Sequence, residues 1–474
     1  MMPRPLATRM MVPTCVAIAA CVAAGTAMSL RAPLTPLIAI GAAVALVSLQ
    51  WRAGVIMLLI ALPFSGVPAF VAGSSGLAAR DLLIVLPLYA GFALEIVRRR
   101  ESVLPAFGIA LPALTIFAAL VLAYVPSAPS SASGAIAVRV WLAYVPMMAI
   151  GYTFVRRIED AETILKLTAL LGLIPAVIAI AECAYATQTA GFGPLEHLYG
   201  SGRLDEAGRF VVLSTGGDGH IRIPRVPSTF TSVSQYFGFA LVAFSCALSM
   251  ALRRRTGEWA LCAAALGVAA LASGARAAYV MVPAIAIVSV LIDDFRPGRC
   301  VAVAALFAAL GGVAIAIGVD PISIARELPA HALVTLDTAW AEMRDSLRFA
   351  GHGTGWDTNA ALRHGNIAER RYIENWYAKA SLELGAAGLV AIVAAFSAMG
   401  FALVRSLAKA DHRTRQMATP LVVMLVVTIG ALFKGPYIDL DPLNVYFWLL
   451  LGVTMALFSQ VTDAFAEQGE EAAQ

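Results

Sequence analysis

The chain has 474 residues, of which 60% are hydrophobic and only 14% are charged. Its mean hydropathy of +0.80 is too high for a water-soluble core, and an ordinary soluble domain carries a larger charged share, about 25%. This composition excludes a soluble globular protein and predicts an all-α, polytopic transmembrane helical bundle, while the net charge of +4 says little because the placement of charges matters more than their sum.

Apolar windows follow one another along most of the chain. A transmembrane helix needs about 20 mainly apolar residues. Fourteen windows approach that length, at residues 10–30, 33–49, 53–71, 81–97, 104–124, 135–154, 161–183, 229–251, 257–272, 276–292, 300–318, 375–403, 417–433 and 442–459. Several are short or contain proline, so we expect about 12–14 spans. Basic residues precede the first window, as in a secretory signal, but the many spans that follow favour an uncleaved helix.

The basic residues fall mainly on alternate connections between these windows. Seventeen lie on one set of connections: Arg4, Arg9, Arg52, Arg98, Arg99, Arg100, Arg156, Arg157, Arg253, Arg254, Arg255, Arg296, Arg299, Arg405, Lys409, Arg413 and Arg415. The short connections of the other set hold Arg31, Arg80, Arg276 and Lys434. Because cytoplasmic loops carry the excess of Lys and Arg, we expect both termini in the cytoplasm and the two long loops outside.

The windows and loops divide the chain into six parts. We expect N-terminal transmembrane helices that serve as scaffold at 1–183, a first long outer loop at 184–228, central transmembrane helices at 229–318, a large outer loop at 319–374, C-terminal transmembrane helices at 375–460 and an acidic, disordered cytoplasmic tail at 461–474.

Two arginines lie near the outer ends of early windows. Arg80 adjoins Asp81, which predicts a local ion pair, with a contact to pyrophosphate as the alternative. Arg139 lies a few residues inside a span, where a charge is costly unless it is paired or lines a wet cavity. Trp141 and Tyr144 beside it are typical of an interfacial belt, so Arg139 either anchors the helix end or binds substrate.

The first long loop is rich in glycine, which favours irregular structure or short hairpins over helix. It ends with IRIPRVPSTFTSVSQYFGFA, where Arg222 and Arg225 stand just before a span. Two guanidinium groups at a membrane surface suit bidentate binding of phosphate oxygens. Lipid headgroups and loop carboxylates are the alternative partners.

Arg276 stands at the tip of a hairpin between two apolar windows. Its neighbours in SGARAAY are small residues, which allow helices to approach closely. Its own segment contains no carboxylate, so the guanidinium needs a partner from elsewhere or an anionic ligand. We predict a functional role for this residue.

The second long loop begins with a helical periodicity. Its apolar positions are Leu333, Leu336, Trp340, Met343 and Leu347. We expect an amphipathic helix that lies on the outer surface. Gly351, Gly353 and Gly355 then predict a tight turn, although no strand precedes them as a phosphate-binding loop would require.

The end of this loop runs directly into an apolar helix. The polar residues at this junction are Arg370, Arg371, Glu374 and Asn375. Asn375, Lys379 and Glu383 recur at every fourth position and therefore share one helix face. Lys379 and Glu383 either satisfy each other or contribute to a binding site.

Metal and disulfide chemistry is not expected. The cysteines, Cys15, Cys21, Cys183, Cys246, Cys262 and Cys300, lie in or beside apolar windows without paired spacing. Asp439 and Asp441 resemble the Asp-x-Asp metal pair of nucleotide-sugar enzymes, but no nucleotide sugar is available on the outer face.

Three segments together resemble the superfamily of O-antigen ligases and O-antigen or exopolysaccharide polymerases, which are bacterial membrane glycosyltransferases. They are PRVPSTFTSVSQYFG at the start of a span, SGARAAY at an outer hairpin tip, and the long outer loop that contains Gly351-x-Gly353 and ends in ENWYAKASLELGAAG. The ligase signature is a His followed by Asn, Ser or Gln, nine residues, Gly, two residues and a small or hydroxyl residue. Asn375, Gly385 and Gly388 fit this signature, whereas Glu374 occupies the His position.

The resemblance implies an enzyme of the inner membrane whose long loops are periplasmic. Such an enzyme takes a glycan from undecaprenyl pyrophosphate and joins it to an acceptor glycan without metal, nucleotide or other cofactor. Arg225 and Arg276 match the functional arginines of the family, and Glu374 stands where its ligases have their base. We expect Arg222, Arg139, Asn375, Lys379, Arg370 and Arg371 to bind substrate. Expected partners are a chain-length regulator and a flippase of the same pathway, with no nucleic acid.

The carboxylate at position 374 bears on the branch of the superfamily. A ligase that acts on lipid A core is expected to keep the His, whereas polymerases vary more at this place. We therefore expect a polysaccharide polymerase, with the ligase as the alternative.

Two other classes fit the composition. A transporter or flippase of lipid-linked oligosaccharides would show an internal repeat with interrupted spans in matching positions, and the two halves show no convincing repeat. A glycosyltransferase that uses a polyprenyl monophosphate sugar would have acidic residues in its first outer loop, where this chain has only Arg31.

The predicted orientation can be tested with reporter fusions. An alkaline phosphatase fusion after Gly365 should be active, because the basic residues place this loop outside, whereas a fusion after Lys409 should be inactive. Activity only after Lys409 would contradict the predicted orientation.

Overall fold

A computed structural model describes residues 34–68, 79–99, 108–189, 210–214, 220–292, 312, 321–356 and 373–473. Nearly all of them are helical, which confirms the predicted all-α bundle. By its contacts the chain divides into two units: Met1–Val103 with Thr229–Thr231, and Leu104–Ser228 with Ser232–Gln474.

The first unit contains a small group of apolar helices. They are α2 (Leu34–Ser48), α3 (Trp51–Ala61), the 3₁₀ turn η1 (Leu62–Phe64), the π-helical turn η2 (Asp81–Val85) and α6 (Leu86–Arg99). Trp51 of α3 meets Phe92 of α6 edge-on, with ring centroids 5.2 Å apart. Arg80 and Asp81 form the predicted local ion pair at 2.6 Å, while the pyrophosphate contact stays a prediction.

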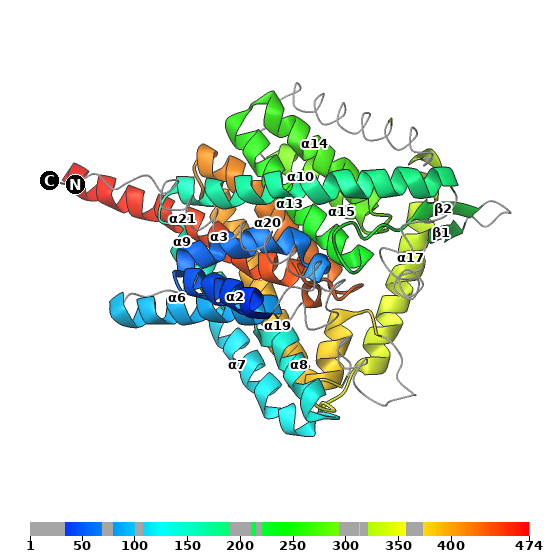
Figure 1. The fold of residues 1–474 in the computed structure, drawn as a ribbon, viewed down its shortest axis with the longest axis horizontal. Helices are drawn as coiled ribbons and strands as arrows, with labels where there is room; N and C mark the ends of the chain where they lie inside the picture. Colours follow the sequence, from blue (N-terminus) through cyan, green and yellow to red (C-terminus); the bar gives the residue numbers. More distant parts are fainter. Residues whose placement is uncertain are drawn as a thin grey trace. The chain divides into compact units, whose positions relative to one another are not determined.

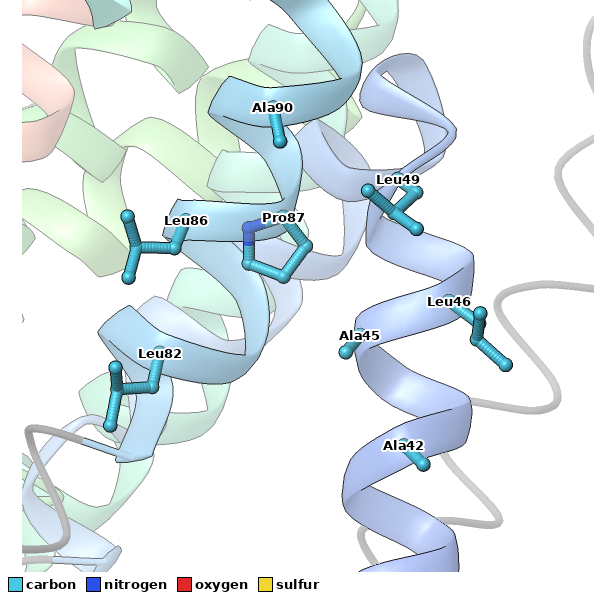
Figure 2. A pocket seen from close by; sticks show the side chains of 8 residues that line it. All are labelled: Ala42, Ala45, Leu46, Leu49, Leu82, Leu86, Pro87 and Ala90. Atoms are coloured by element: carbon cyan, nitrogen blue, oxygen red, sulfur yellow. The ribbon is translucent and has the colours of Figure 1, made fainter.

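An open groove lies between α2 and the helical segment formed by η2 and α6 (Figure 2). Its lining residues are Ala42, Ala45, Leu46, Leu49, Leu82, Leu86, Pro87 and Ala90. All of them are apolar, so the groove offers no group that could bind or activate a polar substrate. It does not take part in the candidate site described below.

The second unit contains the remaining elements. They are α7 (Ala110–Ala123), η3 (Val125–Ser127), α8 (Ser131–Leu142), α9 (Met147–Phe154), α10 (Ile158–Thr189), β1 (Phe210–Ser214), β2 (His220–Pro224), α13 (Val233–Arg254), α14 (Gly257–Ala272), α15 (Ala278–Ile292), α17 (Pro321–Ser346), α19 (Trp376–Lys409), α20 (His412–Ala431), η4 (Tyr437–Asp439) and α21 (Leu443–Ala473). Helix α13 is the most enclosed of the long apolar helices and packs against α10, α14 and α20. In Figure 1, α10, α13 and α14 lie side by side, and α17 runs across the direction of α10.

Six helices in the described part of the chain are long and apolar enough to cross a membrane: Ala110–Ser127, Ser131–Phe154, Ile158–Thr189, Val233–Arg254, Trp376–Lys409 and His412–Ala431. Four further apolar helices are shorter. The chain is therefore a membrane protein by length and composition of its helices. The apolar windows at 10–30 and 300–318 fall outside the described residues, apart from the single residue 312, and the total number of spans stays a prediction.

Two local predictions are confirmed and one is wrong. The first long loop contains an antiparallel hairpin in which β1 pairs with β2 from Phe210 opposite Pro224 to Ser214 opposite His220. The periodic stretch of the second loop lies in α17 apart from Leu347, which confirms the predicted helix, while its place on the outer surface stays a prediction. The tail, by contrast, is not irregular, because α21 continues to Ala473. Its Ala, Glu and Gln residues are good helix formers and can extend a helix that is already nucleated.

Helix α19 is broken near its start, where the sequence predicted a continuous apolar helix. Gly385 has φ 72° and ψ −172°, a conformation that interrupts the helix. A Cβ atom at this position would lie 2.6 Å from the carbonyl oxygen of Phe349, so only glycine fits. The break separates a short first segment, which begins at Trp376, from the long apolar remainder.

The turn at Gly351–Gly355 fills this break. His352 N donates to the Leu382 carbonyl at 2.9 Å, and Gly353 N donates to the Glu383 carbonyl at 3.1 Å. These two carbonyls lack helical donors because the chain leaves the helix at Gly385. The glycine turn therefore serves as a local cap inside the protein and confirms the predicted tight turn.

Substitution of Gly385 by Ala should weaken the docking of this turn. The left-handed backbone and the short contact with Phe349 predict a loss of about 1–3 kcal/mol in the free energy of unfolding. Thermal unfolding of the purified protein in detergent would measure it. Gly400→Ala in the same helix is the matched control, because a Cβ atom there meets nothing within 4 Å. Equal unfolding temperatures of the two variants would contradict the proposed role of the break.

Candidate functional site

The segments that carry Arg225 and Arg276 lie against each other. Val226 N donates to the Ser273 carbonyl at 3.2 Å. Gly274 has φ +70°, and a Cβ atom on it would lie only 2.1 Å from the Pro224 carbonyl oxygen. The close approach therefore depends on glycine at the hairpin tip. Arg225 and Arg276, which are distant in the sequence, thus lie on neighbouring backbone segments.

Glu374 lies within electrostatic reach of Arg276. Partial burial lowers the pKa of the Arg276 guanidinium from its ordinary value, and the Glu374 carboxylate acts in the opposite direction. Arg276 is nevertheless exposed. The carboxylate that the segment of Arg276 lacks is thus supplied by the end of the second long loop.

Glu374 also forms an ion pair with Lys434, whose Nζ meets Oε2 of the carboxylate. Both side chains keep access to solvent, at 44% for Glu374 and 32% for Lys434. The Glu374 carboxylate also acts on Tyr437. Burial, and secondarily this carboxylate, raise the pKa of the Tyr437 phenol to about 12. Glu374 is therefore paired with Lys434, and its charge also acts on Arg276 and Tyr437.

The backbone around Glu374 is held from two sides. Asn375 N donates to Oε2 of Glu342 at 2.9 Å, and its Nδ2 donates to the Ala339 carbonyl at 2.9 Å, so both bonds lead to α17. Trp376 N donates to the Leu432 carbonyl at 2.9 Å and so joins the start of α19 to the end of α20. The backbone next to position 374, at the start of α19, is therefore anchored to α17 and α20.

Asn375 itself is fully buried and serves as the N-cap of α19, since its side chain accepts a hydrogen bond from Ala378 N at 3.1 Å. Asn is among the best N-cap residues. These contacts give Asn375 a structural role in placing Glu374, and its predicted contact with substrate stays a prediction.

Lys379 and Glu383 each have a partner on another element. Lys379, which is fully buried, forms an ion pair with Asp439 at 3.7 Å. Asp439 also accepts a hydrogen bond from Trp376 Nε1 at 2.5 Å. Burial raises the pKa of Asp439, and Lys379 and Trp376 act against this rise. This buried pair connects α19 to the segment η4 that follows Lys434.

Glu383 connects α19 to α8 and to the glycine turn. Its Oε2 accepts hydrogen bonds from Trp141 Nε1 at 2.8 Å and from Gly355 N at 3.0 Å. The carboxylate is fully buried, so these donors compensate for its lost hydration. Glu383 is thus a structural link of the fold.

For the other arginines predicted to bind substrate, the structure shows side-chain contacts only for Arg139. Arg139 in α8 donates to Tyr144 Oη at 3.1 Å, and its guanidinium lies 5.8 Å from the centre of that ring, a contact consistent with an anchoring role. Arg222 lies on β2 opposite Val212, and its side chain is not described. Arg370 and Arg371 lie outside the described residues.

Two charged residues of importance were not singled out from the sequence. In the sequence, Lys434 served only to predict the orientation of the spans. Its ion pair with Glu374 joins residues that are far apart in the chain, and local spacing does not reveal such a pair. Glu182 ends an apolar window, and its carboxylate accepts a hydrogen bond from Ser228 N at 3.0 Å just before α13. A carboxylate within an apolar window is a signal that could have pointed to it.

Comparison with known proteins found no match, either to a protein-family model or to a curated protein. In the described part of the chain, no group of three or more His, Cys, Asp or Glu residues is placed to hold a metal ion. Cys183, Cys246 and Cys262 are free thiols there, and the other three cysteines fall outside it.

The buried pair of Lys379 and Asp439 should be strongly coupled. Lys379→Met and Asp439→Asn each leave one polar partner buried without its counterpart, so each should lower the free energy of unfolding by about 3–5 kcal/mol. The double variant should lose less than the sum of the two. A double-mutant cycle by thermal unfolding in detergent would measure this, and additive losses would show that the pair is not coupled.

Proposed function

We propose that this protein is a bacterial inner-membrane glycosyltransferase that uses an undecaprenyl-pyrophosphate-linked glycan as donor at the periplasmic face. The acceptor is a hydroxyl group of a second glycan, and the product is a longer lipid-linked polysaccharide. The observation that carries the proposal is the packing of the hairpin tip of Arg276 against the segment of Arg225, within electrostatic reach of Glu374. One carboxylate and two guanidinium groups are the groups that this reaction requires.

The chemistry explains the need for both kinds of charge. The bond between the anomeric carbon and the pyrophosphate oxygen breaks, and a bond between that carbon and the acceptor oxygen forms. Negative charge develops on the departing pyrophosphate, which guanidinium groups stabilise at a site that is partly shielded from water. The acceptor hydroxyl loses its proton to a general base, which we assign to Glu374.

The pairing of Glu374 supports the polymerase branch over the ligase branch. In the ligase signature this position is a His, which can be neutral at physiological pH. Here the position is a carboxylate that forms an ion pair with Lys434. The site is therefore built around an anionic side chain.

Arg276→Ala and Glu374→Gln should each abolish polymer formation while the protein stays in the membrane. Loss of charge stabilisation at Arg276 should reduce the rate by about 100- to 1,000-fold, and loss of the base at Glu374 by about 100- to 10,000-fold. Electrophoresis of the glycans made by a deletion strain that carries each variant would measure this. Full-length polymer from either variant would remove that residue from the mechanism.

Two controls sharpen this experiment. Arg344→Ala changes an arginine of α17 whose side chain is 73% exposed, and it should leave the polymer unchanged. Retained activity of Glu374→His would support a base at position 374, because His can also accept a proton. In the deletion strain, single repeat units would indicate the polymerase, whereas unattached long chains would indicate the ligase.

A further inference from the structure

The ion pair between Lys434 and Glu374 differs from the buried pairs of this fold. Glu374 and Lys434 keep 44% and 32% of their side-chain surface exposed, whereas Lys379 and Asp439 keep 1% and 6%. A pair with this access to water contributes little to stability, because the attraction is screened and each ion is hydrated when separated. The pair can therefore open at low cost.

The backbone that carries the two residues stays in place when the side chains separate. Trp376 N donates a hydrogen bond to the Leu432 carbonyl, and Lys434 N donates one to the Ala431 carbonyl, each at 2.9 Å. The ring of Phe433 meets Trp340 of α17, with centroids 6.1 Å apart. Neither position depends on the ion pair for its location, so the pair is free to act in ligand binding.

Helix ends favour both charges at this junction. Glu374 directly precedes the N-cap of α19, where the helix dipole is positive, and Lys434 follows the end of α20, where it is negative. Each charge therefore remains favourable at its own helix end after the ion pair opens. The junction presents an ammonium group and a carboxylate side by side, within electrostatic reach of Arg276.

We propose that Lys434 is a further cationic ligand of the donor pyrophosphate, and that donor binding exchanges its ion pair with Glu374 for a contact with the pyrophosphate. This inference rests on the proposed function. A pyrophosphate carries more negative charge than one carboxylate, so it attracts Lys434 away from Glu374 and also attracts the nearby cation Arg276. The carboxylate is then free to accept the proton of the acceptor hydroxyl, so the base becomes available only when a donor is present.

The exchange has a consequence that a purely structural ion pair lacks. Glu374 competes with the pyrophosphate for Lys434, so removal of its charge should strengthen donor binding even though it abolishes transfer. Removal of Lys434 should weaken donor binding. An ion pair that only supports the fold predicts no gain in affinity from either change.

Binding of farnesyl pyrophosphate to the purified protein in phosphatidylcholine nanodiscs tests the proposal. We expect Lys434→Met to weaken binding by about tenfold or more, Lys434→Arg to bind within about threefold of the wild type, and Glu374→Gln to bind at least about threefold more tightly. Arg344→Ala is the matched control and should bind as the wild type does. The unfolding temperature of each sample shows whether the variant is folded.

The outcomes separate this inference from the proposed function. If the wild type does not bind farnesyl pyrophosphate, the proposed function fails and the inference with it. If Arg276→Ala loses binding while folded Lys434→Met binds as tightly as the wild type, only the inference fails. If Glu374→Gln binds no more tightly than the wild type, the exchange is overturned, and this result does not depend on the folding of Lys434→Met.

Discussion

Backbone groups in the apolar part of a membrane protein must find hydrogen-bond partners within the protein. The break of α19 at Gly385 is one place where this requirement applies, because the helix there leaves carbonyl groups without helical donors. The turn at Gly351–Gly355 supplies the donors, and Glu383 holds it through Gly355 N. The second long loop is thereby attached to the helical bundle at a defined point. This attachment fixes the glycine turn against the start of α19.

The charged residues around the start of α19 perform two different tasks. Lys379, Asp439 and Glu383 are fully enclosed, and their partners are protein groups on neighbouring elements. Glu374, Lys434 and Arg276 lie at the edge of the same region, where the side chains remain accessible. The inner charges fix the geometry, and the outer charges are the ones that the proposed function assigns to ligand binding and catalysis.

The sequence indicated Arg276 and Arg225 as candidates because each is an arginine beside an apolar window, and Glu374 because it stands at the His position of the ligase signature. It did not reveal that Arg225 and Arg276 lie on adjacent segments, since this contact depends on the left-handed Gly274 at the hairpin tip. Periodicity suggested that Lys379 and Glu383 pair on one helix face. The structure shows that Lys379 has a partner in η4 and that Glu383 has partners in α8 and in the glycine turn, which the spacing did not indicate. Local spacing shows which residues share a face, but not which neighbouring element that face meets.

Composition and hydropathy alone determined that the chain is a helical membrane protein, because lipid imposes long apolar segments with satisfied backbones that can be read directly from residue order. They also indicated the hairpin of the first long loop and the amphipathic helix α17, whose signals are local. Only the tertiary structure decided the break at Gly385 and the neighbours of Glu374. Those features arise from contacts between residues far apart in the chain, such as Lys434 with Glu374, and no short-range pattern encodes such pairs.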